Sequence, residues 1–190
     1  GLAGVTADTV LVRYTDAATT VAADTTLTVG STSYTFIEAI APSTIALEVT
    51  GFEANVADFV SLSGDLGFKK SGTEIIAVGS DVTASLTAGG AVSVTLADAD
   101  FGLKAGAGST AFELKNGTFA ASISGLAQVT ADTVLVRYTD AATTVTGGTV
   151  LTVGSTSYTF DEAIAAGTIA LEVTGFAADV ADFVSLSGDI

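Results

Sequence analysis

The sequence predicts an all-β chain with an elongated repeat architecture, in which short strands stack in the manner of a solenoid. Three observations predict it: apolar and polar residues alternate along short segments, glycine and aspartate interrupt these segments, and one long string occurs twice. Alternation with Val, Thr, Tyr and Phe is typical of strands, and its interruption by Gly, Ser, Asn and Asp is typical of turns. Helical periodicity is almost absent, so we expect little or no helix.

The repeat is long and nearly identical. Residues 1–66 align with residues 125–190 at a constant offset of 124 positions and without a gap; of the 66 aligned pairs, 11 differ and 55 are identical. The differences fall mostly at 22–26 and 37–43, which we expect to be loops. The chain therefore holds one full period, 1–124, and the first half of the next, 125–190. We expect it to be a piece of a longer tandem array.

The first 52 residues of the period predict four strands. Residues 6–16 (TADTVLVRYTD) form an alternating strand that is bracketed by aspartates. Residues 26–36 (TLTVGSTSYTF) predict two strands around a Gly-Ser turn, and residues 44–52 (TIALEVTGF) place alternate apolar side chains on one face. The rest of the period continues in the same way. Residues 57–68 (ADFVSLSGDLGF) alternate around Gly64, and Lys69 and Lys70 follow at an expected hairpin tip.

Internal similarity divides the period further. Three sub-units are expected at about 2–51, 52–90 and 91–125, and each closes on a strand that ends at or just before glycine. Stacked sub-units would share a continuous core. The alternative is that each 124-residue period folds as a separate β-sandwich, in tandem. No proline-rich or polar linker lies at either seam, which favours the continuous stack.

The charge balance limits the partners. Six basic and 21 acidic residues give a formal net charge of −15, which repels nucleic acid and anionic membranes. No apolar run approaches the roughly 20 residues of a membrane helix, so we expect no membrane insertion. The expected partners are instead neighbouring repeats of the same chain, and like chains in a fibre.

The residue types also argue against catalysis. The chain has no histidine and no cysteine, so the commonest general base and the thiolate nucleophile are missing. Asp98 and Asp100 are the nearest paired carboxylates, and we expect no glycosidase chemistry from them. We predict that the chain is not an enzyme, with no catalytic residue and no organic cofactor.

Aspartates are the polar residues with a positional pattern. Asp58 and Asp65 bracket one strand, and Asp182 and Asp189 are their copies. One interpretation is that these carboxylates cap turns by accepting hydrogen bonds from nearby amides. The other is that neighbouring repeats bring them together around calcium, which takes six to eight oxygen ligands. Calcium is the one cofactor that the sequence leaves open.

Strings such as VTADTVLVRYTD, GSTSYTF and ADFVSLSGDLGFKKSG resemble repeat modules of giant bacterial surface or secreted proteins, of the kind grouped with RTX adhesins. The resemblance implies an extracellular or cell-surface location in a bacterium, and calcium that rigidifies the repeats. It also implies that the repeats act as spacers or stalks. The expected function is therefore a structural extension or fibre-forming segment of a large exported protein. The alternative is a repeat-based binding module for a polysaccharide or for a mineral or ice surface.

Overall fold

The structure is a computed structural model that describes residues 4–57, 59–181 and 183–190, and it contains strands, turns and loops there but no helix. The strands are β1 (Gly4–Thr6), β2 (Thr9–Tyr14), β3 (Thr26–Val29), β4 (Thr32–Thr35), β5 (Thr44–Val56), β6 (Val60–Ser71), β7 (Glu74–Ala88), β8 (Val92–Gly106), β9 (Ser109–Ile123), β10 (Ala127–Thr139), β11 (Thr149–Val153), β12 (Thr156–Phe160), β13 (Ile169–Thr174), β14 (Phe176–Val180) and β15 (Val184–Gly188). The all-β prediction is confirmed.

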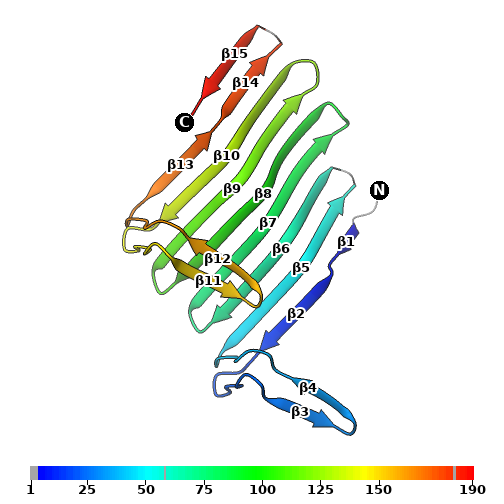
Figure 1. Cartoon of the computed structure of the whole chain (residues 1–190), viewed down its shortest axis with the longest axis vertical. Coiled ribbons are helices and arrows are strands. Elements are labelled where there is room, and N and C mark those ends of the chain that lie inside the picture. Colours follow the sequence, from blue (N-terminus) through cyan, green and yellow to red (C-terminus); the bar gives the residue numbers. More distant parts are fainter. Residues whose placement is uncertain (1–3, 58, 182) are drawn as a thin grey trace.

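Eleven of these strands form one open antiparallel sheet (Figure 1). From β5 to β10, each strand pairs with the next along the chain. At one edge, β1 and β2 lie end to end along β5; beyond β10, β13 and β14 lie end to end along it, and β15 pairs with β14. The sheet passes from the first copy of the repeat to the second without a break.

The structure does not confirm the finer prediction of a solenoid-like stack of short strands. β7, β8 and β9 are each 15 residues long and lie edge to edge in the sheet. The boundary expected between the first two sub-units, at 51/52, lies inside β5. The alternative of separate tandem sandwiches is not seen in the described residues either, because β10 pairs with β9 on one side and with β13 and β14 on the other.

Most long strands of the sheet carry a β-bulge near the middle. The pairing register shifts at Val49/Phe52 in β5, at Ser63/Asp65 in β6 and at Gly79/Val82 in β7. Near such shifts, Asp81 in β7, Asp98 in β8 and Asn116 in β9 have positive φ. Asp and Asn tolerate that conformation better than other residues with a Cβ. Bulges bend strands and increase their twist.

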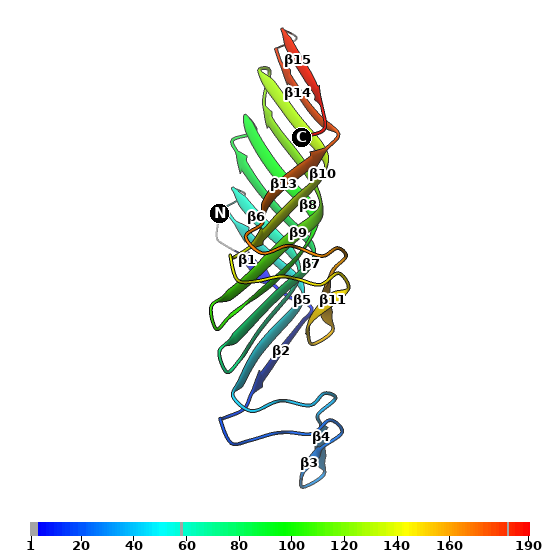
Figure 2. The same cartoon turned by 90° about the vertical axis from the view of Figure 1, so that its left-hand side faces the viewer.

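Two hairpins of nearly identical sequence lie in different surroundings. The hairpin β11–β12 crosses one face of the sheet and packs against β5 to β8, whereas β3–β4 lies beyond the edge of the sheet (Figures 1 and 2). The buried apolar cluster lies under β11–β12 and includes Leu151, Val153, Tyr158 and Phe160. In β3–β4 all eight residues are exposed.

Candidate functional site

The buried apolar cluster of the described chain lies at the contact between β11–β12 and the sheet. We call the sheet side of this contact the docking face; it consists of Ala46, Glu48, Gly67, Val78, Gly102, Ala111 and Glu113. Five of these residues form one cross-strand row, because β5 to β9 pair them in the order Glu48, Gly67, Val78, Gly102, Glu113. Residues so paired present their side chains on one face of the sheet.

Two glycines in this row make room for the hairpin. A Cβ added to Gly67 would lie 2.7 Å from Cβ of Val153, and one added to Gly102 would overlap the ring of Tyr158. Either change would force the hairpin away from the sheet. Glycine costs stability inside a strand, and here its lack of a side chain permits the close approach of a second layer.

The hairpin fills the space over the glycines with apolar side chains. Leu151, Val153, Tyr158 and Phe160 are each at most 3% exposed. Tyr158 and Phe160 stack edge to face with ring centroids 5.2 Å apart, a geometry that contributes about 0.5–1.5 kcal/mol beyond the buried area. Alternate residues of each hairpin strand make this contact, as the strand period requires.

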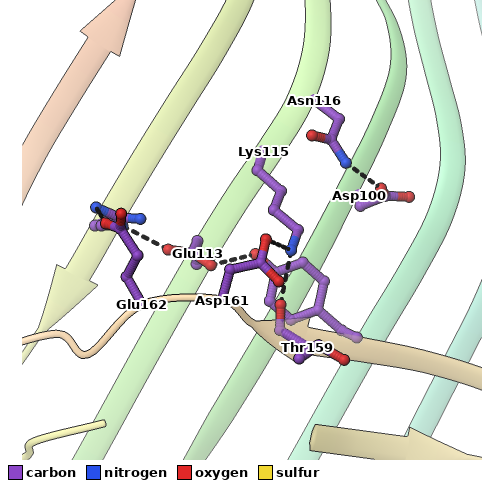
Figure 3. A network of polar contacts seen from close by, with 9 residues as sticks. Asp100, Glu113, Lys115, Asn116, Thr159, Asp161 and Glu162 are labelled. Carbon is purple, nitrogen blue, oxygen red and sulfur yellow. Dashed lines mark hydrogen bonds and ion pairs between the residues drawn. The ribbon is translucent and has the colours of Figure 1, made fainter. Parts of the chain in front are cut away.

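A buried carboxylate joins the hairpin to two strands of the sheet. Glu113 on β9 is fully buried. Nε of Arg137, on β10, donates to one of its oxygens at 2.5 Å, and the hydroxyl of Tyr158 donates to the other at 2.6 Å. Arg137 also pairs with Glu162 beyond the hairpin, at 3.0 Å (Figure 3). A buried charge is costly unless it is paired in this way.

Burial and this pairing together shift two pKa values in the direction that preserves the contact. The hydrogen bond to Glu113 raises the pKa of Arg137. Burial, followed by the hydrogen bond to Glu113, raises the pKa of Tyr158 well above its ordinary range. Tyr158 therefore stays a neutral donor, and the guanidinium of Arg137 stays charged. The groups satisfy one another and hold the hairpin in position.

Further polar contacts hold the sides and the tip of the hairpin. Lys115 on β9 donates to the carbonyl of Thr159 at 2.8 Å and pairs with Asp161 at 2.5 Å (Figure 3). Its ammonium also lies 4.9 Å from the ring centroid of Tyr158, within cation–π distance. At the tip, Glu48 accepts hydrogen bonds from the backbone N–H and the hydroxyl of Ser155, at 2.6 and 2.5 Å.

The aspartates predicted as calcium ligands lie apart from this contact. Asp65 accepts a hydrogen bond from the N–H of Gly51 at 2.7 Å, and Asp189 accepts the equivalent bond from Gly175 at 2.9 Å. Asp58 and Asp182 fall outside the described residues. Within residues 4–57, 59–181 and 183–190, no three acidic side chains gather as a cation site. Calcium binding stays a prediction. Asp65 and Asp189 each bind the backbone of a glycine 14 residues away, which for Asp65 lies at the bulge of the neighbouring strand β5, so these bonds are not turn caps.

The carboxylate pair considered for glycoside chemistry is held in the row of bulges. Asp100 accepts hydrogen bonds from the N–H of Asp81 at 3.2 Å and from the side-chain amide of Asn116 at 2.7 Å (Figure 3). The N–H of Asp98 donates to the hydroxyl of Thr83 at 3.2 Å. These contacts stabilise the bulges of neighbouring strands.

Sequence reasoning missed the docking face entirely. The sequence offered one kind of signal for this face, a glutamate among apolar residues of a strand. Glu48 in TIALEVT and Glu113 in AFELKN are the two instances. A charge at such a position is either on an exposed face or buried with a partner, and the local sequence does not distinguish the two.

In the described part of the chain, no helix is long and apolar enough to span a membrane. Comparison of the chain with protein-family models, with curated proteins and with solved structures returns no match.

Proposed function

We propose that this chain is a structural extension segment, in which each repeat unit adds strands to one growing β-sheet within a large exported bacterial protein. The observation that carries the proposal is the position of β10. This strand corresponds by sequence to β1 and β2, which form an edge, yet β10 lies inside the sheet and pairs with β9. The strand that begins a unit thus pairs with the strand that ends the unit before it.

The spacing of strands gives the length that each unit would add. Six strand-to-strand steps separate β5 from its sequence equivalents β13 and β14. Neighbouring strands lie about 4.8 Å apart, so one period of 124 residues extends the sheet by about 29 Å. A compact domain grows much more slowly, since its radius of gyration rises with about the 0.38 power of chain length.

A series of lengthened chains tests this proposal. Copies of residues 67–190 added after Ile190 continue the sequence in phase, because Ile190 corresponds to Leu66. Small-angle scattering should give a maximum dimension that rises by about 29 Å per added copy. Compact growth, or separate globular beads joined by flexible segments, would contradict the proposal. A chain with the same number of Gly/Ser residues added serves as the control for unfolded extension.

One observation favours the alternative, a binding module for a polysaccharide or for a mineral or ice surface. Hydroxyl side chains pair across β3–β4, Thr26 with Thr35 and Thr28 with Ser33, at 2.9 and 3.1 Å. The second copy retains Thr152, Ser157 and Thr159 but has Val150 where the first has Thr26. Retention on polysaccharide columns or inhibition of ice recrystallisation by the chain, lost when Thr28 and Thr35 become Val, would favour this function over extension.

A further inference from the structure

We infer that the hairpin β3–β4, together with Arg13, is an unfilled docking surface whose partner is the docking face of another copy of the repeat unit. The inference rests on the proposed function and names the contact that would join one unit to the unit before it. It follows from a comparison within the molecule, because the same hairpin sequence occurs once with such a face and once without.

The two hairpins share their sequence but differ in burial. Leu27 and Val29 are 56% and 82% exposed, whereas their equivalents Leu151 and Val153 are 3% and 1% exposed. Tyr34 is 55% exposed and its equivalent Tyr158 only 2%. The apolar side of β3–β4 therefore lacks the layer that covers β11–β12.

The uncovered surface already has the conformation of the docked one. Tyr34 and Phe36 stack edge to face with centroids 5.2 Å apart, as Tyr158 and Phe160 do. The loop that carries the hairpin is also closed by the same backbone bridge, Val21 with Ile40 in the first copy and Val145 with Ile164 in the second. A preformed surface loses little conformational entropy on docking.

Arg13 identifies the charge that the partner supplies. Its side chain is only 11% exposed, and it pairs with Glu38 at 3.3 Å. The atom that makes this ion pair is the buried Nη2, and the contact lacks hydrogen-bond geometry. The equivalent residue, Arg137, has the matching contact to Glu162 and a second one to buried Glu113. Glu113 comes from β9, the strand beside β10, and within the described residues no strand occupies that position beside β2.

The other end of the sheet carries the complementary half. Ala170 and Glu172 on β13 correspond to Ala46 and Glu48 of the docking face, and both are exposed. The complete docking face is filled by β11–β12. The partner of β3–β4 is therefore the face of a further unit, with its glutamate equivalent to Glu113 beside Arg13.

The test gives the whole chain such a face. A copy of residues 44–124, which supplies strands equivalent to β5–β9, is joined ahead of Gly1, so that no further copy of the hairpin is added. Hydrogen exchange is then measured on peptides from the hairpin and from β2 that extend to a residue at which the two copies differ, such as Gly4, Thr26 or Ile37. We expect amides of residues 27–36 to exchange at least about a hundredfold more slowly than in the original chain, since each large apolar side chain that becomes buried shifts the opening equilibrium by roughly ten- to hundredfold.

A control variant separates docking from growth of the sheet. In it the added copy carries Gly102→Val, which favours a strand but overlaps the tyrosine of a docked hairpin. We expect β2 to gain protection in both lengthened chains and the hairpin to gain it only without the valine. Protection of β2 alone in both chains would overturn the inference and leave the proposed function standing. Hairpin protection that persists with the valine would also overturn it, and protection of neither segment would overturn both.

Discussion

The duplicated hairpin allows docking to be measured with a control inside the same molecule. The change is Leu151→Ala, and its matched control is Leu27→Ala. Both leucines begin the identical string LTVGSTSYTF, at 27–36 and 151–160, and lie in the first strand of their hairpin. They differ in exposure, 3% for Leu151 and 56% for Leu27. Any change in strand preference is common to both variants and cancels in the comparison.

The structure sets the size of the difference. Truncation of a buried leucine costs about 2–5 kcal/mol, from lost transfer free energy and from the cavity that remains. Truncation at an exposed strand position costs less than about 1 kcal/mol. We therefore expect Leu151→Ala to destabilise the docked hairpin by about 2 kcal/mol more than Leu27→Ala, or roughly thirtyfold in the opening equilibrium. The loss cannot exceed the docking free energy, because a detached hairpin no longer contacts the cavity.

Hydrogen exchange of peptides from β11–β12 measures this opening directly, and urea denaturation reports whether the sheet itself is affected. Faster exchange in β11–β12 for Leu151→Ala, with the sheet unchanged, is the expected result. Equal effects of the two substitutions would refute the reasoning, since burial under the hairpin would then contribute nothing. An unchanged β11–β12 in the Leu151 variant would refute it as well.

Three further outcomes are expected. Since the pKa of Tyr158 is raised in the folded chain, its contribution to stability is complete below the unfolded pKa of about 10 and is lost as pH rises above it, by up to about 1.4 kcal/mol per pH unit. Denaturation between pH 9 and 12 should show this fall in the free energy of unfolding in the unaltered chain and in the Tyr34→Phe variant, but not in the Tyr158→Phe variant. If the fall persists in Tyr158→Phe, another group causes it. Gly154→Ala should destabilise β11–β12 more than Gly30→Ala destabilises β3–β4, because both glycines have φ near +60° but only the first abuts Glu48; equal losses in hydrogen exchange would contradict this. If the predicted aspartates bind calcium, calcium should raise the melting temperature more than magnesium does, and a chelator titration without any shift would leave Asp65 and Asp189 as acceptors of backbone hydrogen bonds only.

The sequence predicted the part of the fold that depends on local chemistry. Alternation of apolar and polar residues indicated strands, and glycine with serine indicated turns such as the one between β3 and β4 at Gly30 and Ser31. The differences between the two copies marked loops, and the constant offset revealed the period. Alternation and turns are recognised within a few residues, and the repeat is found by comparing the sequence with itself, so none of these signals requires knowledge of which strands pair.

The tertiary structure decided everything that depends on which strands lie side by side. Nearly identical sequences form an exposed hairpin at 26–35 and a buried one at 149–160, so local sequence does not determine burial. The difference comes from residues 44–123, which supply the docking face to the second hairpin and precede it in the chain. For the same reason Glu113 is a buried partner of Arg137, while Arg13 lacks the equivalent carboxylate among the described residues. Burial and charge pairing are properties of the neighbours that a segment meets, and within the described residues the second hairpin meets strands β5–β8 of the preceding unit.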